Sequence, residues 1–101
     1  MQSNFKTSKQ QAADPHETAI AVLGWLADDP EMFGRFLALT GVAPGQVRNA
    51  VNDPGFLAGL MDFLMNHEPT LLQFCQDNDV RVEWVQSCHQ YFTGPGEGAW
   101  L

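Results

Sequence analysis

The segment DPGFLAGLMDFLMN, residues 53–66, has the pattern of one complete helix that is apolar almost all round. Its first two residues form a helix-start signal. Asp53 can cap free backbone N–H groups, and a proline in the first turn lacks only an N–H that would have no intrahelical partner. Large apolar side chains then recur at helical spacing, at Leu57, Leu60, Met61 and Leu64. Because such a helix normally lies in the centre of a bundle, the segment predicts an all-α fold.

The same start signal recurs along the chain. It predicts a first helix from Asp14-Pro15 to about residue 27 and a second from Asp29-Pro30 to about residue 39. The segment 53–66 is the fourth helix. The third and the fifth open with poorer caps, at Ala43-Pro44 and Glu68-Pro69. No stretch alternates as a strand does. We therefore expect a compact bundle of about six short helices, most of them opened by a residue-proline pair.

The sixth predicted helix runs from about Asp79 to Phe92 and has an aspartate start signal without the proline. Asn78, just before it, suits the left-handed conformation that ends a helix, and Gly41 suits the end of the second helix likewise. Asp79 is thus expected to cap the last helix.

The chain divides into three parts by composition. Residues 1–13 are a polar, flexible tail, residues 14–93 form the single helical domain, and residues 94–101 are a tail rich in glycine and proline. Residues 18–27 carry no charge, so they predict a second central helix. Two fully apolar helices are hard to cover in so small a domain, and part of one is expected to face a protein partner or a second copy of the chain.

The charge distribution argues against nucleic acid as a partner. The chain has a net charge of -7, and residues 14–93 contain three arginines against eleven carboxylates. Such a surface repels phosphate backbones, because non-specific affinity for nucleic acid comes mainly from lysine and arginine. The first 13 residues lack the apolar stretch of a secretory signal, and no apolar run is long enough to span a bilayer. We expect a cytoplasmic protein that binds no membrane.

Neither the cysteines nor the histidines indicate a catalytic or metal site. Cys75 and Cys88 fall inside predicted helices with no ligand-type residue at metal spacing, so both are expected to be small buried side chains rather than a disulfide. His16, His67 and His89 lie on separate elements. The sequence therefore predicts no cofactor, no metal and no enzymatic activity.

Asp62 stands out because it interrupts the apolar segment 53–66. A carboxylate at this place must reach solvent or find a cation, and Arg35 and Arg48 are the candidates for a structural ion pair. A solvated stripe on the helix is the alternative.

A helix-turn-helix is the sharpest local resemblance, over residues 36–51. Gly41 fits the turn, and Val47, six positions later, fits the aliphatic anchor of a recognition helix. However, Leu37 stands where a small residue is usual, and Arg48 is the only cation of the second helix. DNA binding through these residues is the alternative function.

Apolar side chains supply the other functional hypothesis. Met61 and Met65 could belong to an adaptable groove for a partner helix, although core filling is the commoner use of such residues. Trp100 either packs on the bundle or offers an anchor to a partner. These residues favour a non-enzymatic module for protein–protein interaction or self-association.

The chain also resembles a small, uncharacterised bacterial family of domains of unknown function. The resemblance covers about residues 17–93 and leaves both tails outside. It rests on LGWLA with Asp29-Pro30, on RFLALTG with Arg48, and on Phe56-Leu57 with Asp62-Phe63-Leu64 and Glu68. It implies an all-helical fold and supplies no site.

Overall fold

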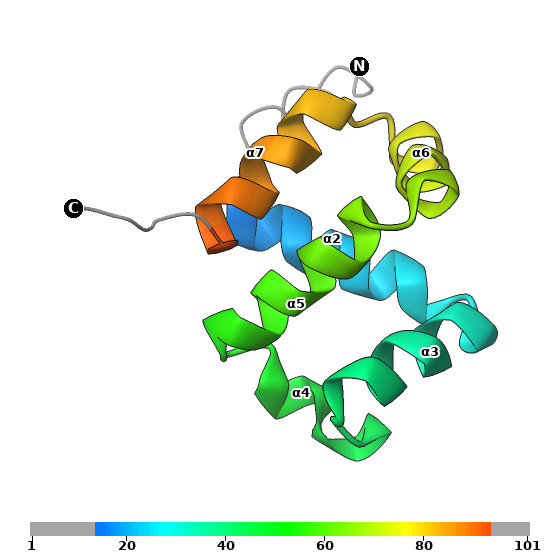
Figure 1. The fold of residues 1–101 in the computed structure, drawn as a ribbon, viewed down its shortest axis with the longest axis vertical. Coiled ribbons are helices and arrows are strands. Elements are labelled where there is room, and N and C mark those ends of the chain that lie inside the picture. Colours follow the sequence, from blue (N-terminus) through cyan, green and yellow to red (C-terminus); the bar gives the residue numbers. More distant parts are fainter. Residues whose placement is uncertain (1–13, 94–101) are drawn as a thin grey trace, which may run out of the picture.

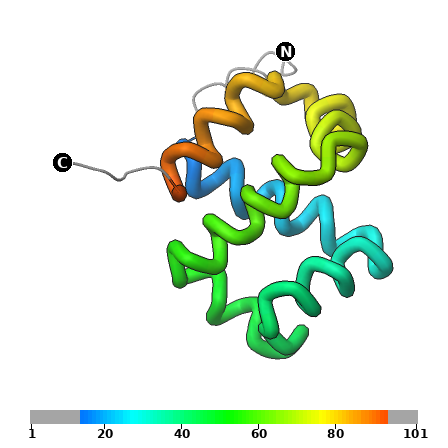
Figure 2. The backbone as a smooth tube through the Cα atoms, in the orientation of Figure 1, coloured from blue at the N-terminus to red at the C-terminus, as the bar shows by residue number. Residues whose placement is uncertain are grey.

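The computed structural model describes residues 14–93 (Figures 1 and 2). Its elements are α2 (Pro15–Ala27), α3 (Pro30–Thr40), the 3-10 turn η1 (Pro44–Gln46), α4 (Val47–Ala50), α5 (Pro54–Met65), α6 (Glu68–Asn78) and α7 (Val82–Thr93). This part of the chain contains no strand, so the predicted all-α bundle of about six helices is confirmed. The predicted tails, residues 1–13 and 94–101, lie outside the described residues.

Three aspartates cap helices as their sequence context predicts. The Asp14 carboxylate accepts a hydrogen bond from the N–H of Glu17 at 2.8 Å, and Asp53 accepts one from Gly55 at 2.8 Å. Asp29 caps α3 in the same way, and each cap is followed by a proline in the first turn. Capping bonds and proline together explain why α2, α3 and α5 begin where they do.

The start predicted for the last helix is wrong. Asp79 adopts the left-handed conformation, with φ of 56°, and its N–H donates to the carbonyl of Cys75, so this residue ends α6. Helix α7 begins three residues later, at Val82. Asn78 keeps helical geometry, and its side-chain amide donates to the carbonyl of Phe74 at 3.0 Å. The physical reason is that aspartate tolerates the left-handed region better than most residues, which competes with its use as an N-cap.

The third predicted helix is short. It consists of η1 followed by the four residues of α4, with no side-chain cap on either piece. Gly41 ends α3 in the left-handed region, with φ of 78°, as expected.

Helices α2 and α5 cross in the middle of the molecule (Figure 1). Helix α5 packs against α2, α3, α6 and α7, and α2 packs against α3, α5 and α7, which confirms that the two largely apolar helices are central. Helices α6 and α7 lie on one side of this crossing, and α3 and α4 lie on the other (Figure 2). The molecule measures 41 × 39 × 25 Å, so it is only about two helix layers thick.

The core fills the space around this crossing. Its largest fully buried side chains are Phe36, Phe74, Leu26, Leu57, Leu60, Met61 and Leu64. A long-range hydrogen bond closes the core, since the indole N–H of Trp84 on α7 donates to the hydroxyl of Thr18 on α2 at 2.8 Å.

Candidate functional site

An open groove lies where the end of α2, the start of α3 and α6 meet, and its volume is about 270 Å³. In Figure 1 these three segments lie on the right of the molecule. Apolar and polar side chains line the groove, namely Trp25, Leu26, Asp29, Met32, His67, Pro69, Thr70 and Gln73. We refer to it as the α2–α3–α6 groove.

Trp25 joins α2 to α6 across this groove. Its indole N–H donates to the carboxylate of Asp77 at 2.9 Å, and its ring meets Phe74 edge-on with the centroids 5.4 Å apart. The amide of Gln73 donates to the other oxygen of Asp77 at 2.8 Å. These hydrogen bonds from Trp25 and Gln73 lower the pKa of Asp77, so this carboxylate is charged at neutral pH and holds the indole in place.

His67 connects α5 to α6 beside the groove. Its carbonyl accepts hydrogen bonds from the N–H groups of Thr70 and Leu71, and its ring nitrogen Nδ1 contacts the hydroxyl of Thr70. The ring also lies parallel to that of Phe63. His67 is the N-cap residue of α6.

The segments that border the groove are acidic. Residues 24–34 and 67–78 contain no lysine or arginine, and their carboxylates are those of Asp28, Asp29, Glu31, Glu68 and Asp77. Asp29 lines the groove directly, and Glu31 and Glu68 are exposed in the first turns of α3 and α6. The site thus combines a largely apolar lining, which includes the carboxylate of Asp29, with acidic bordering segments.

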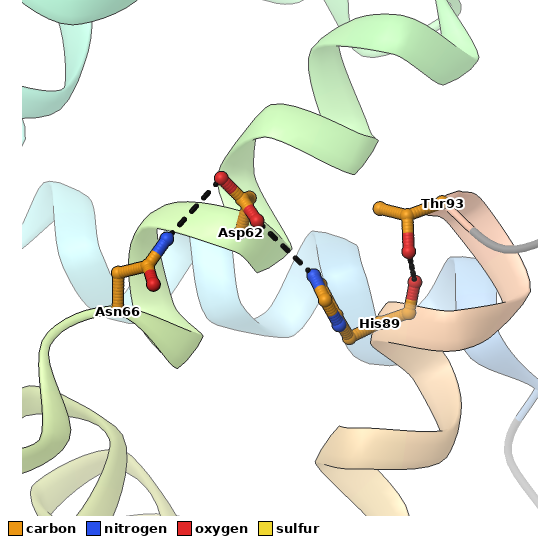
Figure 3. A network of polar contacts seen from close by, with 4 residues as sticks. All are labelled: Asp62, Asn66, His89 and Thr93. Atoms are coloured by element: carbon orange, nitrogen blue, oxygen red, sulfur yellow. Dashed lines mark hydrogen bonds and ion pairs between the residues drawn. The ribbon is translucent and has the colours of Figure 1, made fainter.

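Asp62 lies elsewhere, on the side of α5 that faces α7. Its two carboxylate oxygens contact Nε2 of His89 and the amide of Asn66, each at 3.3 Å (Figure 3). The expected ion pair with Arg35 or Arg48 is therefore wrong. The carboxylate is mostly exposed and points across to α7, so it reaches both solvent and a histidine without either arginine.

Of the residues predicted to contact a partner, the structure describes two, Met61 and Met65, both on α5. Met61 is fully buried between helices, so its predicted role in partner contact is wrong. It faces inward with Leu57 and Leu64, on the side of α5 that the other helices cover. Met65 is half-buried against the core. Trp100 lies outside the described residues.

The two cysteines lie on the helices α6 and α7. Cys75 and Cys88 are free and buried, which confirms their predicted state. Burial raises the pKa of both thiols, that of Cys88 to about 11. In the same range no three residues of the types that bind metals come together as a metal site. No helix of that range has the length and apolar character required to cross a membrane.

The sequence of the groove and of all elements around it falls within a known family. A family model described as "Protein of unknown function (DUF3572)" matches residues 12–95. The chain belongs to the DUF3572 family. This match confirms the resemblance to an uncharacterised family of unknown function. No curated protein and no solved structure matches this DUF3572 chain.

The groove of this DUF3572 domain could be predicted only in part. The two largely apolar helices pointed to uncovered apolar surface, and the helix-start signals included two of the five bordering carboxylates, Asp29 and Glu68. The pairing of Trp25 with Asp77 joins residues 52 positions apart, and no local pattern in the sequence reports it.

Proposed function

We propose that this domain is a non-enzymatic protein-interaction module, and that the α2–α3–α6 groove binds a positively charged partner segment with an apolar anchor. The observation that carries the proposal is the combination of an apolar lining, which includes Trp25 and Met32, with borders that hold five carboxylates and no lysine or arginine. The two free thiols fit a reducing compartment such as the cytoplasm.

The apolar lining and the carboxylates of the groove each favour a different property of the partner. The lining of Trp25, Leu26, Met32 and Pro69 is complementary to one or two apolar side chains. Aromatic and methionine side chains of this kind are enriched in the centres of protein interfaces. The carboxylates around them attract lysine or arginine and repel acidic segments, so they select the partner by charge.

The test is a selection of random peptides displayed on phage against the folded chain. We expect the bound peptides to combine lysine or arginine with leucine, phenylalanine or methionine. In the domain, the double variant Glu31→Lys with Glu68→Lys should weaken their binding about 10-fold or more, because it reverses two charges on the segments that border the groove. Both glutamates are exposed in first helical turns, so the substitutions leave the core intact.

The matched control is the double variant Glu17→Lys with Glu83→Lys. These glutamates are likewise exposed in first turns, on α2 and α7, and lie outside the two segments, residues 24–34 and 67–78, that border the groove. The control changes the net charge by the same amount, and it also removes the exposed ion pair of Glu83 with Arg81, but it should leave peptide binding within about 2-fold. Equal loss in both variants, or selection of acidic peptides, would contradict the proposal.

DNA binding through residues 36–51 is the second candidate function. Two observations favour it, since Gly41 makes a left-handed turn after α3 and Val47 packs on the core, as a helix-turn-helix requires. The helix that follows, α4, has only four residues, and Arg48 is its one cation. A salt-sensitive shift of duplex DNA that is lost in Arg48→Gln would support this function, and no shift at low salt would exclude it.

A further inference from the structure

A second open cavity, of about 290 Å³, lies on a different part of the surface. It is formed where the start of α2, the start of α5 and the end of α7 meet. Its walls are His16, Asn52, Pro54, Leu57, Tyr91 and Phe92. We refer to it as the α2–α5–α7 cavity, and it shares no residue with the α2–α3–α6 groove.

The walls of this cavity suit a flat aromatic side chain. The rings of Tyr91 and Phe92 meet edge-on with centroids 5.0 Å apart, and the ring of His16 lies 6.4 Å from that of Phe92. Buried Leu57 supplies an apolar base, and Asn52 supplies a polar side chain. Tyr91 is 63% exposed, which is a large uncovered area for an aromatic residue. A further aromatic ring would cover it and gain edge-on or stacked contacts.

The chain itself carries such a ring close to the cavity. Phe92 is one residue before the end of α7 at Thr93, and the sequence continues as GPGEGAWL, which places Trp100 seven residues after Thr93. A glycine-rich segment of seven residues has an r.m.s. end-to-end distance of roughly 15 Å, and it can turn back within that distance. A tether of this length gives its side chain an effective concentration on the order of millimolar at the cavity.

We propose that the side chain of Trp100 occupies the α2–α5–α7 cavity of its own chain and covers Tyr91. Asn52 and His16 offer acceptors at the cavity wall for the indole N–H, and the apolar walls take the ring. This contact is intramolecular, and it fastens residues 94–101 to the side of the bundle away from the α2–α3–α6 groove.

The test is NMR of the full chain labelled with ¹⁵N and ¹³C. Trp100→Ala removes one of three indole N–H signals and so assigns the signal of Trp100. We expect nuclear Overhauser contacts from the Trp100 indole to the rings of Tyr91 and Phe92. These contacts and the chemical shift of the indole should not change with protein concentration. The Tyr91→Ala variant should shift the Trp100 signal toward the value of an unstructured peptide. The matched control is Leu72→Ala, which removes another exposed apolar side chain, on α6, and should leave the signal unchanged.

Three results would overturn the proposal. A Trp100 indole with an unstructured shift and no ring contacts would show that the cavity does not bind it. Contacts that appear only at high protein concentration would assign the occupant to a second copy of the chain. Contacts from Phe5 in place of Trp100 would assign the cavity to residues 1–13. None of these results bears on peptide binding at the α2–α3–α6 groove, so the two proposals fail independently.

Discussion

Cys88 shows how burial changes the chemistry of a side chain in this domain. The thiol is fully buried on α7. Loss of solvent raises its pKa to about 11, and the hydrogen bond with Thr18 offsets only part of that rise. The thiol therefore remains protonated at neutral pH and behaves as a small apolar group, in agreement with what the sequence predicts.

The raised pKa of Cys88 predicts a loss of stability at alkaline pH. The unfolded thiol ionises near pH 9.0 and the folded one near 11, so its contribution is complete below pH 9 and is lost as the pH rises from 9 to 11. In that window the free energy of unfolding should fall by up to ~1.4 kcal/mol per pH unit more than in Cys88→Ala. Urea unfolding at several pH values measures this difference. The exposed Ser87→Ala serves as the control, and equal slopes in Cys88→Ala and the parent would contradict the prediction.

The contact between Asp62 and His89 leads to a second prediction at the level of residues. Because the carboxylate is mostly exposed, the pair should contribute less than about 1 kcal/mol to the free energy of unfolding. A double-mutant cycle with Asp62→Ala and His89→Ala should give a small coupling energy. The cycle of Asp62→Ala with Arg48→Ala should be additive. A clear coupling energy in that cycle would show that Asp62 pairs with Arg48 and would contradict the structure.

Single residues could be predicted from the sequence where their role is local. Asp14, Asp29 and Asp53 cap the helices whose first turn they precede, and this role depends on two or three neighbouring residues. The partner of Asp62 is 27 positions away, and the orientation of α5 against α7 chooses it. Charge alone favoured an arginine, but packing determined which side chain lies within reach.

At the level of elements, aspartate has two opposite roles at helix ends in this domain. Asp79 ends α6 in the left-handed conformation, whereas Asp29 begins α3 as an N-cap. Asp79→Gly should therefore be neutral or stabilise the protein by up to about 1 kcal/mol, because glycine adopts positive φ without steric cost. Asp29→Ala should instead destabilise it by about 1 kcal/mol. Thermal unfolding of both variants measures this contrast, and equal destabilisation would mean that Asp79 caps α7 after all.

Helix existence was more predictable than helix boundaries for a physical reason. Apolar spacing extends over many residues and identifies α2, α5 and α7 with little ambiguity. A helix boundary depends on local hydrogen bonds that compete with one another. An aspartate can cap the start of a helix or adopt the left-handed conformation that ends one. The same competition explains why the third predicted helix is divided into η1 and the single turn of α4, which no side chain caps.

At the scale of the whole molecule, the described residues carry a large excess of negative charge. Residues 14–93 hold eleven carboxylates and three arginines, and their ion pairs are those of Arg81 with Glu83 and of His89 with Asp62. Like charges therefore repel one another over a molecule only 25 Å thick. Screening by added salt should relieve this repulsion and stabilise the folded state.

This repulsion predicts a dependence of stability on ionic strength. Raising NaCl from low concentration to about 0.5 M should increase the melting temperature by a few degrees, on the order of 1 kcal/mol. The double variant Glu17→Lys with Glu83→Lys should gain less, because it carries less excess charge. Calorimetry at several NaCl concentrations measures both, and a melting temperature that falls with salt would contradict the prediction. The same salt should weaken peptide binding at the α2–α3–α6 groove.

The ends of the described chain lie close together, because His16 in the first turn of α2 contacts Phe92 near the end of α7. Joining these ends by a short peptide would make a closed chain, which could be reopened at an exposed connection such as that after α4. We expect such a permuted chain to fold to the same bundle although its helices are synthesised in another order. For the same reason, the whole bundle could be placed within a surface loop of another protein without pulling that loop apart.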